Sequence, residues 1–201
     1  MIKLYGTAMS RASRCLWMLE EAGVPFENVP TSFAGDAQTT EFKKINPNGR
    51  VPALDDDGLI LWESMAINLY LAERYAKDLA PRNAAERAHV LKWTLWGVTE
   101  IEPGLIDAFV HRTMLPAAQR IAAVADAGAA KLARPLAVLD QTLAGHSWLV
   151  DERFTVADLN VASVLFIAPM AHVDLAPYPN VQRWLSACLD RPAAKKALGR
   201  G

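Results

Sequence analysis

The sequence predicts two domains, an α/β domain followed by an all-α helical bundle. Short apolar runs typical of strands alternate with helical patterns up to about residue 78, and only helical patterns follow from about residue 84. The hydrophobic content of 52% in 201 residues is ample for one large core or two small ones. We therefore expect an α/β domain over 1–78, a linker over 78–83 and a helical domain over 84–201.

The first half of the α/β domain reads as strand, helix, strand. Apolar runs at 2–5 and 26–29 are bounded by glycine or proline, as buried strands often are. Between them, apolar residues from Ala12 to Leu19 recur at helical spacing, and the pattern ends at Gly23.

The second half adds two strands and two helices. Apolar runs at 51–54 and 59–61 are separated by the residues 55–58, which end in Asp-Gly, a strong hairpin signal. A short helix ends near Ile45 before the hairpin, and a longer helix follows over 64–75. The order β-α-β-α-β-β-α predicts a mixed sheet with helices on its faces.

The second domain shows only helical patterns, rich in alanine and leucine. Thr155 and Asp158 have the spacing of a capping box at the start of an apolar helix, which is a folding device. The predicted helices cover 84–113, 117–143, 156–171 and 180–198.

Composition excludes several classes of function. The net charge is −1 without a basic block, which argues against a nucleic-acid or anionic-membrane surface. No apolar run approaches the roughly 18 residues of a membrane span, and the start is too short for a signal-peptide core. Cys15 and Cys188 are too few for a disulfide framework or a four-ligand zinc site. We expect a protein of the reducing cytoplasm.

Two serines, Ser10 and Ser13, stand where the first strand turns into the first helix. A thioredoxin-like fold carries Cys-x-x-Cys at this turn, so serines here argue against dithiol redox chemistry. A hydroxyl at a helix start instead donates to an anion and lowers the pKa of a bound thiol by roughly one to three units from about 8.5. The alternative is that Ser10 only caps the helix. Cys15 lies on the apolar stripe and is predicted to be a small buried hydrophobe.

Two further segments suit a peptide-like ligand. A proline at Pro52 predicts a turn and an edge strand; a cis Val51–Pro52 bond would instead turn the Val51 backbone outward to pair with a ligand. Ser64, at or near a helix N-cap, either caps the helix or leaves its amides free for a carboxylate. Glu63 beside it attracts an ammonium group, so the pair suits an amino-acid end group.

Together these segments resemble the cytosolic glutathione transferases, of the bacterial, serine-dependent kind similar to the theta, zeta and beta classes. The resemblance runs from Met1 to about Leu198. The matching stretches are Leu4-Tyr5-Gly6 before Ser10, Leu19 to Glu27, Asn46-Pro47 to Leu54, Leu61 to Ile67, and Phe154 to Asp158.

The resemblance implies a thioredoxin-like first domain that binds glutathione as cosubstrate, and a homodimer. Ser10 matches the serine that stabilises the thiolate, because it stands four residues before Arg14, and Ser13 is its rival. Val51 would pair its backbone with the cysteinyl part of glutathione through a cis Pro52.

The two ends of glutathione have their own candidates. The resemblance implies that Glu63 and Ser64 hold the γ-glutamyl end. Arg50 matches the basic residue before Val-Pro, near the glycyl carboxylate. Gln38 is a second candidate there, because the polar or histidine residue that members often carry before the next helix is missing.

The function implied is a detoxification reaction in which glutathione thiolate attacks a small hydrophobic electrophile in a cleft between the domains. Met9 and Phe109 are the candidates for its wall. We expect no metal, no redox cofactor, no nucleic acid and no membrane partner. Two alternatives remain: a non-catalytic glutathione-binding protein of the same fold, and a glutathione-dependent disulfide reductase.

Overall fold

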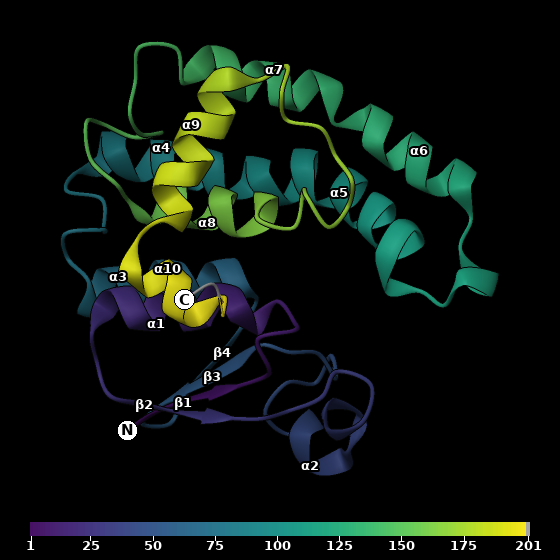
Figure 1. Cartoon of the computed structure of the whole chain (residues 1–201). Helices are drawn as coiled ribbons and strands as arrows, with labels where there is room; N and C mark the ends of the chain where they lie inside the picture. Colours follow the sequence, from purple (N-terminus) through teal and green to yellow (C-terminus); the bar gives the residue numbers. More distant parts are fainter. Residues whose placement is uncertain (200–201) are drawn as a thin grey trace. The chain divides into compact units, whose positions relative to one another are not determined.

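The computed structural model describes residues 1–199 and divides the chain into two compact units (Figure 1). Unit 1 comprises residues 1–81 and the C-terminal segment from Asp190; unit 2 runs from Arg82 to Leu189. The chain thus enters unit 2 within the expected linker. The predicted second domain, 84–201, differs at its end, because the last helix packs on a helix of unit 1.

Unit 1 is built on a four-stranded mixed sheet of order β2-β1-β3-β4. β1 pairs with β2 in parallel and with β3 in antiparallel, and β3 pairs with β4 in antiparallel. The predicted element order and mixed sheet are confirmed. The strands are β1 (Ile2–Tyr5), β2 (Phe26–Val29), β3 (Ala53–Asp56) and β4 (Leu59–Trp62).

The predicted hairpin joins β3 to β4. Asp57 and Gly58 have φ values of 49° and 95°, the left-handed pair that a two-residue turn of this kind requires. The Gly58 N–H donates to the Asp55 carboxylate at 2.8 Å, which closes the turn. The register of β4 is therefore fixed by the turn that the Asp-Gly pair predicts.

Helices complete unit 1. α1 ends where predicted, because Gly23 adopts φ 63° and its N–H bonds to the carbonyls of Leu19 and Glu20. α1 contacts α3, α10 and β1, and this packing leaves its first turn next to the end of β1. The helices are α1 (Ala12–Ala22), the 3₁₀ turn η1 (Asp36–Gln38), α2 (Thr40–Lys43), α3 (Ser64–Tyr75) and α10 (Pro192–Ala197).

Two tyrosines of α3 form hydrogen bonds to the sheet. The buried Asp56 carboxylate at the end of β3 accepts hydrogen bonds from Tyr70 at 2.6 Å and Tyr75 at 2.7 Å. The bond to Asp56 raises the pKa of Tyr70 to about 12, because the phenol proton is held by the carboxylate. The later part of α3 is thereby held against the end of β3.

Unit 2 is helical throughout its regular structure, as predicted. None of the helices in the described part of the chain is both long and apolar enough to cross a membrane. The helices are α4 (Ala84–Trp96), η2 (Gly97–Ile101), α5 (Glu102–Phe109), η3 (Val110–Met114), η4 (Ala117–Gln119), α6 (Ala122–Lys131), α7 (Ala133–Thr142), α8 (Val156–Leu165) and α9 (Pro179–Leu189).

The predicted helix boundaries need three corrections. The pattern over 117–143 forms two helices with a break at Leu132, because Pro135 suits only the first turn of a new helix. The pattern over 180–198 likewise splits before Pro192 into α9 and α10. The pattern over 156–171 leaves the α-helix after Leu165.

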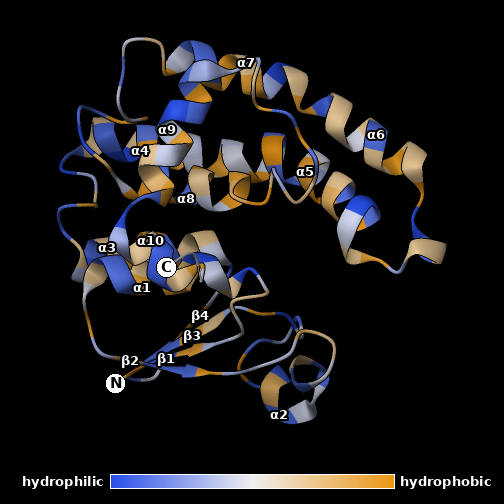
Figure 2. Ribbon diagram, in the orientation of Figure 1, coloured by the Kyte–Doolittle hydropathy of each residue, from blue (hydrophilic) through white to orange (hydrophobic). Residues whose placement is uncertain are grey.

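α5 and α6 approach each other closely at two glycines. A Cβ added to Gly104 would lie 2.7 Å from the Gly128 carbonyl oxygen, and one added to Gly128 would lie 2.7 Å from the Gly104 oxygen. Most of the α6 ribbon has hydrophobic colours because the helix is mainly alanine (Figure 2). Small side chains on α6 thus let the two helices pack at short range.

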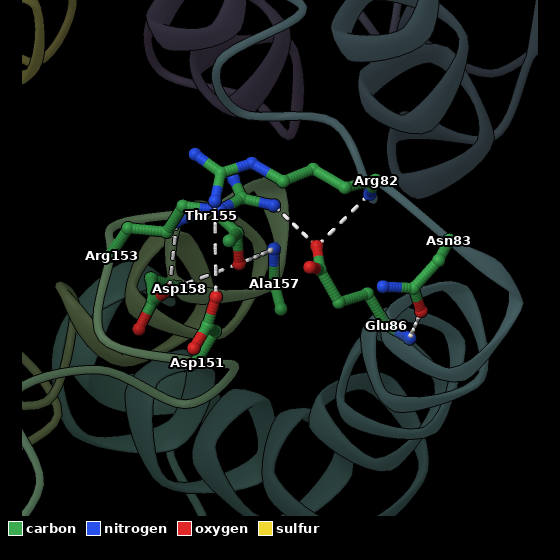
Figure 3. A network of polar contacts seen from close by, with 8 residues as sticks. All are labelled: Arg82, Asn83, Glu86, Asp151, Arg153, Thr155, Ala157 and Asp158. Atoms are coloured by element: carbon green, nitrogen blue, oxygen red, sulfur yellow. Dashed lines mark hydrogen bonds and ion pairs between the residues drawn. The ribbon is translucent and has the colours of Figure 1, made fainter.

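The predicted capping box opens α8 (Figure 3). The Thr155 hydroxyl accepts the Ala157 N–H at 3.3 Å, and the Asp158 carboxylate accepts the Thr155 N–H at 2.9 Å. Asp158 also accepts the Leu149 N–H and the Trp184 indole N–H, each at 2.9 Å. One buried carboxylate therefore joins α8, α9 and the segment before α8.

Replacing this carboxylate destabilises unit 2. We expect Asp158→Ala to lower the free energy of unfolding by about 3 kcal/mol or more, because three buried N–H donors lose their acceptor. The matched control Glu152→Ala removes an exposed carboxylate whose one ion pair among residues 1–199 is with His146, and it costs under about 0.5 kcal/mol. Urea unfolding measures both, and equal midpoints would contradict the assigned role.

Candidate active site

Ser10 lies just before α1 and is partly exposed. Its hydroxyl donates to the Thr7 carbonyl at 2.8 Å, and its Oγ accepts the Ala12 N–H at 3.2 Å. The amide contact holds the oxygen at the helix start and polarises the O–H bond. The hydroxyl proton is the part of this group that a ligand can recruit, because the Thr7 carbonyl is its present partner.

The backbone amides of the first turn of α1 are already engaged. The Ala12 N–H donates to Ser10 Oγ, the Ser13 N–H to the Ser10 carbonyl at 3.0 Å, and the Arg14 N–H to the Arg11 carbonyl at 3.3 Å. An anion at this helix start therefore meets a hydroxyl rather than a set of free amides. These amides therefore do not add to an anion site in this conformation, which differs from the prediction for the helix start.

Ser13, the rival of Ser10, lies inside the unit. Its relative exposure is 2%, whereas Ser10 is partly exposed. The neighbour Met9 is 92% exposed. The structure thus presents Ser10 and Met9 to solvent at the turn and encloses Ser13.

Val51 lies beside the Ser10 turn. A Cβ built on Gly6, whose φ is 140°, would lie 3.4 Å from Val51 Cβ and 3.5 Å from Ser10 Oγ. The Val51–Pro52 bond is cis, the second of the two possibilities considered above. Within residues 1–199, no protein hydrogen bond occupies the Val51 backbone N–H or carbonyl. A hydroxyl and an unpaired backbone edge therefore meet around Gly6, where a side chain has no room because a Cβ would lie 2.5 Å from Ala12 Cβ.

Ser64 is the first residue of α3, and Glu63 rather than Ser64 is the N-cap. Glu63 has a φ of 72°, its side chain is exposed, and no side chain caps the helix. The amides of the first turn of α3 are therefore left to an anion, which favours the second of the two interpretations of Ser64. The positive φ also separates the Glu63 side chain from the helix axis.

Arg14 is a site residue that the sequence reasoning used only as a marker. It is 5% exposed, and its Nη1 donates to Ser64 Oγ at 3.4 Å. A buried guanidinium thus lies beside the uncapped start of α3, and its charge favours a carboxylate there. The signal in the sequence is a charged residue, Arg14, in an otherwise apolar stripe of α1.

The loop between α2 and β3 carries Arg50. Buried Asn46 shapes the loop: its Nδ2 donates to the Arg50 carbonyl at 2.6 Å. Gln38 braces it from outside, since its Nε2 donates to the carbonyls of Phe33 at 3.2 Å and Gly49 at 2.7 Å. Both amide hydrogens of Gln38 are thus used within the protein, which leaves the exposed Arg50 as the cation offered by this loop.

Lys43 is a second cation at this loop that the sequence reasoning missed. Its Cε lies 3.0 Å from the position that a Cβ on Gly49 would take. Gly49 has a φ of 61°, so glycine suits this turn, and its bare surface lets the lysine stem lie against the loop.

The predicted pocket residue Phe109 is the last residue of α5 in unit 2 and is partly buried.

The other reactive side chains lie elsewhere. Cys15 is fully buried, as predicted, and its Sγ donates to the Ser64 carbonyl at 3.6 Å. Burial raises the pKa of the Cys15 thiol, with Arg14 opposing. All four histidines belong to unit 2. In the described residues, no group of three or more His, Cys, Asp or Glu side chains is arranged to hold a metal ion.

Both thiols are expected to be inert in the folded protein. Cys15 and Cys188 have no exposed surface, so an aromatic disulfide reagent should react with them only after unfolding. The measurement is the release of the coloured thiolate with and without denaturant. Rapid modification of Cys15 in the native protein would contradict its burial beneath the start of α3.

Two family models match most of the chain, and relatives match nearly all of it. The model of the glutathione S-transferase N-terminal domain matches residues 1–73, and that of the C-terminal domain matches residues 104–192. Glutathione S-transferase GstB of Escherichia coli K12 is 33% identical over 98% of both chains. Glutathione S-transferase 1 of Zea mays is 35% identical over 97% of this chain and 94% of its own.

A solved structure agrees in fold. The theta-class glutathione S-transferase of Xanthomonas axonopodis pv. citri, solved with glutathione bound, is 32% identical, with a TM-score of 0.93. The match covers 98% of this chain and 96% of that one. These relatives favour a transferase over a non-catalytic binding protein or a disulfide reductase. The fold, the serine at the start of α1 and these matches agree: the chain belongs to the glutathione S-transferase family and is a transferase enzyme.

Proposed function

We propose that Ser10 holds bound glutathione as its thiolate, which then attacks a small hydrophobic electrophile. The observation that carries this proposal is the meeting of the partly exposed Ser10 hydroxyl and the unpaired backbone of Val51 on the two sides of Gly6. A cysteinyl residue that pairs its backbone with Val51 brings its sulfur close to the Ser10 hydroxyl. Ser13 is enclosed and is the weaker candidate.

The energy available at Ser10 is a difference between two hydrogen bonds. The present bond to the Thr7 carbonyl is between neutral groups and contributes about 0.5–1.5 kcal/mol, whereas a bond to a charged thiolate contributes about 1.5–3 kcal/mol. Turning the proton from Thr7 to the sulfur thus gains roughly 1 kcal/mol. That gain lowers the thiol pKa by about one unit from its usual value near 8.5, enough to populate the thiolate at neutral pH.

The chemical step is a displacement. The thiolate sulfur supplies an electron pair to the electrophilic carbon, a carbon–sulfur bond forms, and the bond to the leaving group breaks as that group takes its electron pair. The thiol proton leaves to solvent when glutathione ionises, so the step needs no further base. Ser10 contributes by stabilising the thiolate and by holding its sulfur in one place.

The ends of glutathione are assigned to two places in unit 1. Its γ-glutamyl carboxylate lies at the uncapped start of α3 with Ser64, near buried Arg14, and its ammonium group faces Glu63. Its glycyl carboxylate lies near Arg50, with Lys43 beside the same loop. The glycyl end thus meets cations alone, whereas the γ-glutamyl end meets both a cation and an anion. This difference fixes the direction in which the tripeptide binds.

The electrophile, the compartment and the assembly are further parts of the proposal. Met9 and Phe109 stay our predictions for apolar contacts with the electrophile. Cys15 and Cys188 are buried thiols that do not form a disulfide, which suits the reducing cytoplasm. A homodimer is supported by apolar residues exposed at the sheet edge, where Leu59 and Trp62 of β4 are 44% and 42% exposed. Leu95 of α4, in unit 2, is 60% exposed.

Ser10→Ala should impair catalysis and Ser13→Ala should not. Loss of about 1 kcal/mol of thiolate stabilisation lowers kcat/KM for an activated aryl chloride about fivefold at neutral pH, and it raises the pKa of the pH–rate profile by nearly one unit. The Michaelis constant for glutathione changes little, because the ends of the tripeptide keep their partners. Equal activity of Ser10→Ala and the wild type, or a loss confined to Ser13→Ala, would reassign the serine.

The dimer has a separate test. Light scattering coupled to size exclusion should give about twice the chain mass of 22.0 kDa. Trp62→Glu should shift the protein toward the monomer, because it places a charge on the exposed edge strand. The control Val138→Glu changes a comparably exposed residue on α7, 43% exposed, and should leave the mass unchanged. A wild-type mass near that of one chain rejects the dimer.

A further inference from the structure

The C-terminal helix, α10, packs beside α1. After α9 the chain returns to unit 1, where α10 packs against α1 and buries Ala194 completely. α1 also packs on α3 and contacts β1, so it is held between helices. α10 is therefore in direct contact with the helix whose start carries Ser10.

Two ion pairs join α10 and its start to α1, and they differ in strength. Arg191 donates from Nε at 2.6 Å and Nη2 at 2.7 Å to the two oxygens of Glu21, whose side chain is 8% exposed. The Trp17 indole N–H donates to the same carboxylate at 3.0 Å. A bidentate contact of this kind is both strong and geometrically specific.

The second ion pair is of the ordinary surface kind. Lys196 contacts Glu20 at 2.7 Å through one oxygen; the side chains of Lys196 and Glu20 are 71% and 18% exposed, against 31% and 8% for Arg191 and Glu21. Solvent screens such a contact, and the ammonium group does not fix an orientation. The two ion pairs involve neighbouring residues of α1, Glu20 and Glu21. The Lys196–Glu20 pair can therefore serve as a control for the bidentate Arg191–Glu21 pair.

The directional link lies at the opposite end of α1 from the sulfur site. α1 is 11 residues long, so Glu21 lies about 16 Å from the Ser10 turn, too far for Arg191 to touch glutathione. A helix transmits an axial shift along its length because its hydrogen bonds hold successive turns together. Hydrogen bonds weaken steeply with distance and angle, so a small displacement at Ser10 alters its bond to the sulfur.

We propose that Arg191 is a positioning residue for the transferase reaction: its bidentate contact with Glu21 fixes α1 along its axis and so sets the placement of the Ser10 hydroxyl against the glutathione sulfur. The proposal rests on the proposed role of Ser10. Arg191 makes no contact with substrate and acts through Glu21 and the helix. The C-terminal segment thereby contributes to the ionisation of the bound thiol.

The test compares Arg191→Ala with the matched control Lys196→Ala in the full-length enzyme. The readout is the pKa of bound glutathione, followed by the ultraviolet absorbance of its thiolate in the binary complex, together with kcat/KM. Arg191→Ala should raise this pKa and lower kcat/KM about threefold to fivefold, no more than Ser10→Ala does, while glutathione affinity at low pH stays within about twofold. Lys196→Ala should leave both values within about twofold of the wild type.

A merely stabilising role gives a different result. If Arg191→Ala lowers the melting temperature but leaves the pKa of bound glutathione and kcat/KM within twofold of the wild type, the positioning role is overturned. If Arg191→Ala does not fold, Arg191→Lys replaces it; it keeps the charge but loses the fork and should still raise the pKa. An unchanged pKa in Arg191→Lys overturns the proposal.

The same titration of Ser10→Ala distinguishes a failure of the positioning role of Arg191 from a failure of the proposed role of Ser10. A raised pKa in Ser10→Ala with an unchanged pKa in Arg191→Ala rejects the positioning role alone. An unchanged pKa in Ser10→Ala rejects the proposed role of the hydroxyl and removes the basis of the positioning role with it.

Discussion

The hydrogen bond from the Ala12 amide to Ser10 Oγ is the contact on which the site depends. It fixes the serine oxygen at the start of α1 and leaves the hydroxyl proton as the group that changes partner. Because the other first-turn amides are engaged within the turn, the Ser10 hydroxyl is the donor that this helix start offers to an anion. The Ser10 hydroxyl then donates either to the Thr7 carbonyl or to a thiolate, and the thiolate is the stronger acceptor because it is charged.

The rest of unit 1 places partners around that hydroxyl. Gly6, which has no side chain, lets α1, Ser10 and Val51 approach one another closely. Asp56 holds the later part of α3 through two tyrosines, and the contact of Arg14 with Ser64 joins the uncapped start of α3 to α1. The sheet thus aligns the ends of two helices at one face, one end suited to a sulfur anion and the other to a carboxylate.

Much of this fold follows from local sequence, and parts of the site do not. The hairpin at Asp57–Gly58, the end of α1 at Gly23 and the capping box at Asp158 depend on contacts a few residues apart, and the sequence predicts each of them. The cap of α3 falls on Glu63 because tertiary packing sets its backbone at a positive φ, which residue type alone does not reveal.

Contacts distant in sequence account for the remaining differences. The role of Arg14 depends on its meeting Ser64, and Gln38 is committed to the Gly49 carbonyl across a loop. Pro192 marks the break between α9 and α10, but the choice of unit follows from the contact of Arg191 with Glu21. Spacing rules reach one or two turns of helix or one hairpin, and these contacts lie beyond that range.

A crystal structure of the enzyme with glutathione tests the central claim most directly. The account predicts that Ser10 Oγ lies within about 3.5 Å of the sulfur and that its hydroxyl no longer donates to the Thr7 carbonyl. A sulfur held instead by Ser13, or a Ser10 hydroxyl that stays bonded to Thr7 in the complex, would contradict it.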